Sequence, residues 1–515
     1  MKFSSRGGPS GPPSAIASVS RAAVLLALIA LVSACARHAP PSVAPPRNPA
    51  AVRALQSDLD RIFDIPLLGH ALVGVEVRSL ATGERLYTRN AARFVMPASN
   101  MKILTMSASA ERLGWDYRFE TTLVSDATVE DGILRGDLVV VGSGDPSINS
   151  RDDRARAVFD EWAAQLSAAG IRAVDGRLIG DDDAFDDEGL GPGWSWDYLA
   201  YGYAAPIGAL QFNEDLVQVT LKPGSVPGAP AAVEIAPAES GLTLVNHVVT
   251  GEPNTSASID LYRLPGRAEL EVAGTIAAGA EPITRAAAVD NPTVFFVQAL
   301  KAALIARGID VRGEAVDIDD LGEGRPAAAG RRVLATSLSP PLAAIGTTLM
   351  KVSQNLYAET LLKTLGRGDR PGSTDRGRET VREVLTSWGV QPDGYIQSDG
   401  SGLSRYNYVT ADAIVTILTH LYSDPRHREA FAAALPIAGR DGTIAGRLKG
   451  TRAEANVRAK TGSIANVRAL SGYLTTRDGE PLVFSIIANH FNLPASTVDY
   501  AVDIAVETLA NFTRK

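Results

Sequence analysis

The sequence predicts an α/β protein in which strand-rich insertions interrupt one catalytic domain. Residues 72–113 follow a strand, turn, strand, helix order, and residues 456–512 follow a strand, hairpin, helix order. Between these segments, from about residue 118 to about residue 330, short strand-like runs and turns prevail. The two ends are therefore expected to form one α/β domain, and the middle is expected to form one or two β-rich modules.

The individual elements follow from alternation of apolar residues, turn residues and helix boundaries. The helical segment that begins at Pro97 ends at Gly114, a residue that commonly follows a helix. Asp478-Gly479, typical of a hairpin turn, separates two alternating runs. Strands are expected at 72–79, 85–88, 136–142, 268–274, 456–463, 468–476 and 482–489, and further helices at 342–365, 375–388, 410–422 and 494–512.

The first 34 residues have the features of an export signal. They hold Lys2, Arg6 and Arg21 and no acidic residue, and an apolar run at 22–32 is followed by Ser33-Ala34-Cys35. A basic region, a short apolar region and small residues before a cleavage site are typical of secretory signals. The run is too short for a comfortable membrane span.

Cys35 is the single cysteine of the chain and follows this signal directly. It is either a chance cysteine in a secreted protein or a site of lipid attachment. Val-Ser-Ala-Cys resembles the bacterial lipobox, which favours lipidation. In a Gram-negative bacterium, Ala36 in place of aspartate implies transfer of the lipoprotein to the outer membrane.

Residues 35–50 are rich in proline and are expected to form a stiff tether. At about 3 Å per residue, the tether spans roughly 45 Å. The predicted organisation is a signal peptide at 1–34, the tether at 35–50, a catalytic domain at 51–117 and 331–515, and inserted β-rich domains at 118–330.

Composition argues against binding of nucleic acid and against a metal or cofactor site. The 515 residues are 45% hydrophobic and 21% charged, as expected for a folded protein of several domains. The net charge is −8 and no basic stripe is present, so nucleic acid is not an expected partner. The six histidines lack the close spacing of zinc ligands, so neither a metal nor another cofactor is expected.

Ser99 and Lys102 form the only Ser-x-x-Lys of the sequence. On a helix, positions three apart share a face, so the amine can reach the hydroxyl. Burial would lower the pKa of the lysine and let it accept the serine proton, which arginine cannot do. Because the chain holds only nine lysines, one at this place is suggestive. Taken alone, the pair is a weak signal, and a serine near a helix N-cap is the better explanation.

Two later motifs add the remaining parts of an acyl-transfer site. Ser353 offers a hydroxyl for proton relay, and Asn355 a carboxamide that can bind both the lysine and a substrate amide. Lys460 and Thr461 can bind a carboxylate, and Gly462 on an edge strand would let a substrate backbone approach closely. The backbone N–H groups of Ser99 and Ser463 are candidates for an oxyanion hole.

These three motifs occur in the order known for penicillin-binding proteins and class A β-lactamases. From about residue 55 to 515 the chain resembles the low-molecular-mass class C penicillin-binding proteins, the D-Ala-D-Ala carboxypeptidase/endopeptidases. The long separation of Lys102 from Ser353 distinguishes it from class A β-lactamases. The resemblance rests on residues 97–105, 136–146, 193–198, 209–213, 353–363, 399–405 and 460–463.

The resemblance implies a β-lactamase/transpeptidase-like domain with two β-rich domains inserted after the nucleophile helix. It implies that Ser99 attacks the penultimate D-Ala carbonyl of a peptidoglycan stem peptide, with the proton passing to Lys102. Lys460 and Thr461 would hold the terminal carboxylate, and β-lactams would inhibit covalently. Asp197 is a candidate contact for the diaminopimelate side chain, and is equally consistent with a solvated loop carboxylate.

Three alternatives stay open from sequence alone. A β-lactamase would share the motifs, but it usually needs a carboxylate that positions water, and no clear candidate lies nearby. A catalytically weak penicillin-binding structural or sensor lipoprotein would be expected to carry a damaged motif, and none is damaged. A Ser-His-Asp hydrolase is disfavoured because Gly-x-Ser-x-Gly is absent.

Overall fold

The computed structural model describes residues 48–515. The expected export signal at 1–34, Cys35 and nearly all of the tether at 35–50 lie outside the described residues. Helix α2 (Pro49–Phe63) begins directly after them, with Asn48 as its N-cap. Within residues 48–515, none of the helices has the length and apolar character needed to cross a membrane.

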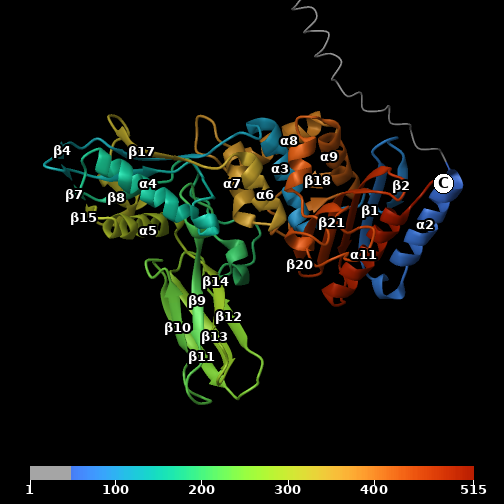
Figure 1. Ribbon diagram of the computed structural model, residues 1–515, viewed down its shortest axis with the longest axis horizontal. Helices are drawn as coiled ribbons and strands as arrows, with labels where there is room; N and C mark the ends of the chain where they lie inside the picture. The colour runs from blue at the N-terminus through green and yellow to red at the C-terminus, as the bar shows by residue number, and fades with distance from the viewer. Residues whose placement is uncertain (1–47) are drawn as a thin grey trace, which may run out of the picture. The chain divides into compact units, whose positions relative to one another are not determined.

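A five-stranded antiparallel sheet joins the two ends of the sequence. β1 pairs with β22 over its whole length, so blue and red strands lie together in Figure 1. β21 is the one strand of this sheet that pairs with β20, which therefore forms an edge of the sheet. The order is β2 (Arg85–Arg89), β1 (Leu72–Ser79), β22 (Pro481–Asn489), β21 (Val467–Thr475) and β20 (Arg458–Ile464).

Separate hydrophobic cores cover the two faces of this sheet. Alternate residues of a strand point to opposite faces, and β22 accordingly sends Val483 and Ile487 to one core and Phe484 and Ile486 to the other. Helix α2 and helix α11 (Ala495–Asn511) contribute to the second core. The first core is built by α3 (Met101–Leu113), α6 (Leu342–Lys351), α7 (Asn355–Leu365), α8 (Thr374–Ser387), α9 (Ala411–Ser423) and α10 (Arg428–Ala434).

The helix expected at 342–365 is in fact two helices. α6 ends at Lys351 and α7 begins at Asn355. Ser353, between them, has φ of +62°, in the left-handed region that an α-helix cannot include. The sequence there contains neither glycine nor proline, so no breaker residue marks the interruption.

The first inserted module contains two helices that the sequence analysis did not anticipate. Helices α4 (Arg154–Ala168) and α5 (Pro292–Ala306) pack around buried Trp162 and Phe296. Asn291 caps α5 and Pro292 is its first residue, so a usable helix-start signal was present. The strands form two sheets: β16 (Ala315–Asp317), β8 (Leu178–Asp181), β6 (Leu138–Val141), β3 (Glu120–Ser125) and β17 (Arg332–Leu338); then β15 (Asp310–Val311), β7 (Ala173–Val174), β5 (Ile133–Leu134) and β4 (Val129–Glu130).

Strand β17 corrects the expected return to the catalytic domain at residue 331. It pairs antiparallel with β3, from Arg332 opposite Ser125 to Leu338 opposite Glu120. Its hydrogen bonds therefore attach it to the inserted sheet. The chain rejoins the helices of the catalytic domain only after Ser339, where α6 begins at Leu342.

The second inserted module is built from strands alone, and Figure 1 shows it in green. It confirms the expected β-rich character of this part of the insertion. Buried Val219, Leu270 and Val272 lie in its core. Its two sheets are β10 (Ala232–Ala236), β9 (Leu216–Lys222) and β14 (Ile283–Ala288), and β11 (Thr243–Gly251), β13 (Glu269–Ala277) and β12 (Ser258–Tyr262).

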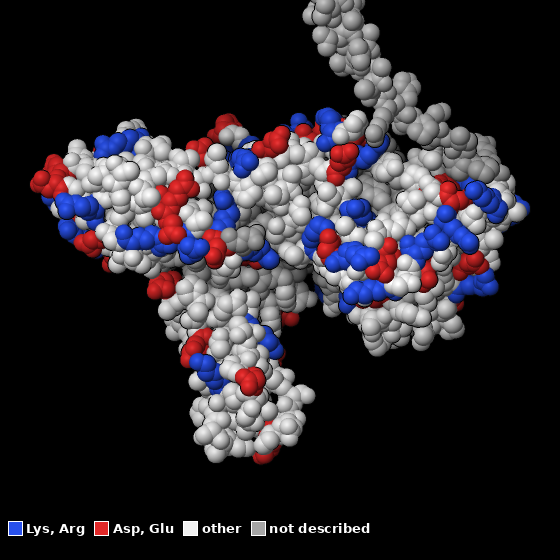
Figure 2. Space-filling view, viewed as in Figure 1, with Lys and Arg blue, Asp and Glu red and all other residues white. Residues whose placement is uncertain are grey.

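Acidic and basic side chains are interspersed on the face shown in Figure 2. No stripe of one sign crosses this face, which agrees with the small net charge of −8. A surface of this kind gives no electrostatic footprint for nucleic acid on the face in view.

Candidate active site

Ser99 lies at the entrance to helix α3. It is the middle residue of a 3-10 helix, Ala98–Asn100, that runs directly into α3. Lys102 follows one turn later, and its Nζ lies 2.9 Å from Ser99 Oγ, within hydrogen-bond distance. The structure thus brings the two residues together as the spacing predicts.

The amine of Lys102 is fully buried and has three oxygen neighbours. Besides Ser99 Oγ, it contacts Asn355 Oδ1 at 2.6 Å and the Ser401 carbonyl oxygen at 2.8 Å. Burial lowers the pKa of Lys102 to about 7, opposed by the charges of Glu359 and Asp399. Near neutral pH, a substantial share of the amine is therefore unprotonated.

The neutral amine keeps two N–H groups and one lone pair. Asn355 Oδ1 and the Ser401 carbonyl oxygen can only accept hydrogen bonds, so they engage the two N–H groups. The lone pair then points to the remaining neighbour, the hydroxyl of Ser99. This arrangement orients Lys102 as a base toward the serine proton.

Two buried carboxylates hold the loop that supplies the Ser401 carbonyl. Glu359 accepts the backbone N–H groups of Gly400 and Ser401 at 2.7 and 2.8 Å. Asp399 accepts those of Gly402 and Ser404 at 2.7 and 2.6 Å. Burial and the nearby charge of Asp399 raise the pKa of Glu359. The carboxyl oxygens fix the loop through these hydrogen bonds, and the Lys102 amine contacts only neutral oxygens.

Gly402 brings this loop against the nucleophile turn. We expect its replacement by alanine to destabilise the protein strongly. Its φ is +89°, and an added Cβ would lie 1.8 Å from the Ala98 carbonyl oxygen. We expect G402A to lower the free energy of unfolding by about 2–4 kcal/mol and to slow acylation at Ser99. Thermal unfolding and penicillin labelling measure the two effects.

Gly446 provides the control for that substitution. A Cβ there meets no atom within 4 Å, and its φ is not in the left-handed region. We expect the free energy of unfolding of G446A to lie within about 0.5 kcal/mol of that of the unchanged protein. Equal stability of the two variants would show that the approach of Gly402 to Ala98 is not needed.

Ser353 and Asn355 reach the site from the break between α6 and α7. The left-handed backbone of Ser353 places its Oγ 2.8 Å from Lys460 Nζ. Asn355 bridges to the insertion, since its Nδ2 donates to the Tyr203 carbonyl oxygen at 2.7 Å. The helix interruption is therefore what brings both side chains to Ser99.

The edge strand β20 carries Lys460, Thr461, Gly462 and Ser463, as expected. Lys460 is fully buried, and burial together with the charge of Lys102 holds its pKa well below the usual value. Its carbonyl oxygen accepts from Asn100 Nδ2 at 3.0 Å, which ties the strand to the nucleophile turn.

Gly462 has a packing role besides the expected close approach of a substrate backbone, which stays a prediction. A Cβ at Gly462 would lie 2.4 Å from the Pro97 carbonyl oxygen and 3.2 Å from Asn100 Nδ2. The glycine is therefore needed for the nucleophile turn to pack against β20.

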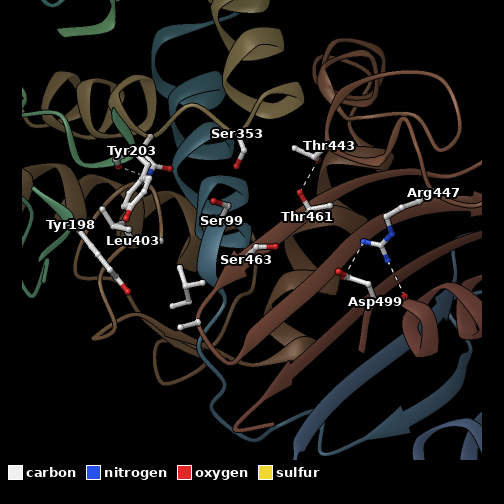
Figure 3. Close-up of a pocket in the computed structure, with 14 residues that line it drawn as sticks. Ser99, Tyr198, Tyr203, Ser353, Leu403, Thr443, Arg447, Thr461, Ser463 and Asp499 are labelled. Atoms are coloured by element: carbon white, nitrogen blue, oxygen red, sulfur yellow. Dashed lines mark hydrogen bonds and ion pairs between the residues drawn. The ribbon is translucent and has the colours of Figure 1, made fainter. Parts of the chain in front are cut away.

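An open cavity of about 530 Å³ lies in front of Ser99 (Figure 3). It brings together the predicted residues Ser99, Ser353, Asn355, Thr461 and Ser463. Asp197 does not line it; this carboxylate is exposed and accepts a hydrogen bond from Ser195 Oγ. Of the other lining residues, Tyr198, Gly402 and Leu403 lie in segments that carry the resemblance but were given no role. The sequence analysis missed Tyr203, Thr443, Arg447, Ile464, Ala465 and Asp499.

Comparison with known proteins agrees with this geometry. The profile of the D-Ala-D-Ala carboxypeptidase 3 (S13) family matches residues 55–509, which is most of the chain. The chain belongs to this family. It is therefore a serine-type hydrolase of the D-Ala-D-Ala carboxypeptidase class, and the resemblance noted from the motifs is confirmed.

Individual relatives extend the comparison over nearly the whole length. A D-alanyl-D-alanine carboxypeptidase of Actinomadura sp. (strain R39) is 36% identical over 489 residues, which cover 92% of this chain and 88% of the relative. The crystal structure of penicillin binding protein 4 (dacB) from Haemophilus influenzae superposes with a TM-score of 0.77 at 26% identity, covering 88% of this chain and 99% of the other. The same protein complexed with a novel beta-lactam gives a TM-score of 0.71 at 25% identity, covering 88% and 98%. These matches confirm the expected β-lactamase/transpeptidase-like fold.

Proposed function

We propose that this enzyme cleaves the terminal D-Ala-D-Ala bond of peptidoglycan stem peptides, and also the D-alanyl bond of peptide cross-links, through an acyl-enzyme at Ser99. The observation that carries the proposal is the 2.9 Å contact of Ser99 Oγ with the buried amine of Lys102. β-Lactams acylate the same serine, in keeping with the complex described for the Haemophilus influenzae relative.

Acylation begins with attack of Ser99 Oγ on the penultimate D-Ala carbonyl carbon. The hydroxyl proton passes to the Lys102 lone pair, and a C–O bond forms as the carbonyl becomes an oxyanion. The backbone N–H groups of Ser99 and Ser463 receive this oxyanion. Thr461 and Lys460 hold the terminal carboxylate, and the Asn355 carboxamide binds the substrate backbone.

Collapse of the oxyanion then breaks the C–N bond and expels the amine of the leaving residue. That nitrogen needs one proton, the one that Lys102 took from Ser99. The Ser353 hydroxyl relays it, giving its proton to the nitrogen and taking one from Lys102, so Ser353 is restored and Lys102 is neutral again. Lys460 Nζ, 2.8 Å from Ser353 Oγ, assists this transfer. Water subsequently attacks the ester carbonyl carbon at Ser99 and gives a proton to Lys102. Lys102 returns this proton to Ser99 Oγ as the ester C–O bond breaks and the shortened peptide leaves. No group other than these side chains and water is required.

Mass spectrometry of purified peptidoglycan after incubation with the enzyme tests the proposal. We expect pentapeptides to lose one D-Ala and cross-linked dimers to become monomers, with both changes blocked by prior treatment with penicillin. Absence of both products would refute the proposal. Steady turnover of a chromogenic cephalosporin, in place of a long-lived adduct, would favour a β-lactamase.

We propose that the enzyme, which acts on the cell wall, lies in the periplasm. We also propose that a lipid attached to Cys35 anchors it in the outer membrane. The support is the basic and apolar segment that precedes the single cysteine of the chain. Labelled palmitate should enter the full chain and not Cys35→Ser. Equal labelling of both proteins would refute a lipid anchor at Cys35.

A further inference from the structure

The cavity in front of Ser99 continues past Thr461 to a charged end formed by Thr443, Arg447 and Asp499. In Figure 3 these residues lie on one side of Ser99, whereas Tyr198, Tyr203 and Leu403 lie on the other. Thr461 Oγ1 donates to Thr443 Oγ1 at 2.7 Å, so this end adjoins the residue assigned to the terminal carboxylate. It is therefore the side toward which the leaving group extends.

Arg447 is held in place at this end by helix α11. Its Nε and Nη2 donate to Asp503 Oδ1 at 3.1 and 2.7 Å, and its Nη1 donates to Asp499 Oδ1 at 3.3 Å. The three side chains are between 20% and 33% exposed, so the guanidinium is both fixed and accessible to a ligand. A fixed guanidinium is well suited to bind a carboxylate.

The two reactions of the proposed function differ in their leaving groups. A pentapeptide releases one D-Ala, whose carboxylate is already assigned to Lys460 and Thr461. A cross-link releases a whole second stem peptide, an acidic peptide with further carboxylates. That peptide must continue beyond Thr461, because its reacting amine occupies the same place as the amine of D-Ala.

We infer that Arg447, positioned by Asp499 and Asp503, is a binding residue for the second stem peptide of a cross-link and receives one of its carboxylates. The inference rests on the proposed function and concerns only the leaving-group side of the site. It makes Arg447 a determinant of the balance between cross-link cleavage and D-Ala release.

The test compares kcat/KM for a cross-linked muropeptide dimer with kcat/KM for a pentapeptide, and takes the ratio. We expect R447Q to lower this ratio at least about tenfold, as loss of a charge-assisted hydrogen bond predicts. Arg468 provides a matched control. Its Nε also donates to Asp499, at 3.3 Å, but it does not line the cavity, so R468Q should leave the ratio unchanged.

A chemical change of the substrate keeps the inference testable if R447Q does not fold. The dimer is amidated on the carboxylates of the leaving stem other than the one beside the reacting amine. We expect the unchanged enzyme to cleave it at least about tenfold more slowly than the free acid, and R447Q to cleave both dimers alike. An unchanged ratio in R447Q, or indifference of the unchanged enzyme to amidation, would overturn the inference. If the unchanged enzyme releases D-Ala but cleaves no dimer, the inference is overturned and the proposed carboxypeptidase activity stands. If the unchanged enzyme shows neither activity, the proposed function itself is refuted.

Discussion

Replacement of Lys102 by arginine is expected to reduce the rate constant for acylation by penicillin by about 10³-fold or more. The substitution keeps the positive charge beside Ser99 but removes the base, because a guanidinium does not lose its proton in proteins. Time-resolved labelling with a fluorescent penicillin at pH 8 measures the rate constant. An arginine variant that acylates within tenfold of the unchanged enzyme would exclude Lys102 as the base.

The pH profile of the unchanged enzyme gives a second measurement of the same group. The pKa of Lys102 is lowered from 10.5 to about 7, so the neutral, reactive form prevails above pH 7 and is lost below it. We therefore expect the acylation rate to fall about tenfold per pH unit on the acid side of pH 7. A rate that stays level down to pH 5 would show that Lys102 is protonated in the acylating enzyme.

The nucleophile and its base could be predicted because their geometry is local. Ser99 and Lys102 lie one turn apart, and helix periodicity alone brings their side chains together. Gly462 was also expected on an edge strand, and β20 lies at an edge of the sheet. The roles of Ser353 and Lys460 came from motif order, and the 2.8 Å contact between them is tertiary geometry that no spacing specifies.

The environment that makes Lys102 reactive could not be predicted from sequence. It depends on burial and on the carbonyl of Ser401, which Glu359 and Asp399 position from separate segments. The residues 399–405 were noted as part of the family pattern, but their contact with the lysine required the structure. Gly462 shows the same limit, since its packing against Pro97 is visible only in the structure.

The leaving-group end of the cavity illustrates why the remaining lining residues were missed. Arg447 and Asp499 come from a loop and from helix α11, and neither belongs to a motif. A charged residue in an ordinary segment carries no local signal of function, because most such residues are solvated surface charges. Only the cavity distinguishes these two from the other charged residues around them.

Replacement of Ser99 by alanine is expected to abolish covalent penicillin labelling and to reduce D-Ala release by at least about 10³-fold. The change removes one oxygen from a residue that lines the cavity and leaves the contacts of Lys102 with Asn355 and Ser401 in place.

Ser109 is a matched control in the same helix: it is buried, donates to the Thr105 carbonyl oxygen and does not line the cavity, so S109A should still be labelled. Thermal unfolding of both variants shows whether a loss of labelling comes from the missing nucleophile or from a less stable fold. An acyl adduct on S99A would place the nucleophile elsewhere, and Ser353, the other cavity serine that contacts a buried lysine, would be the residue to replace next.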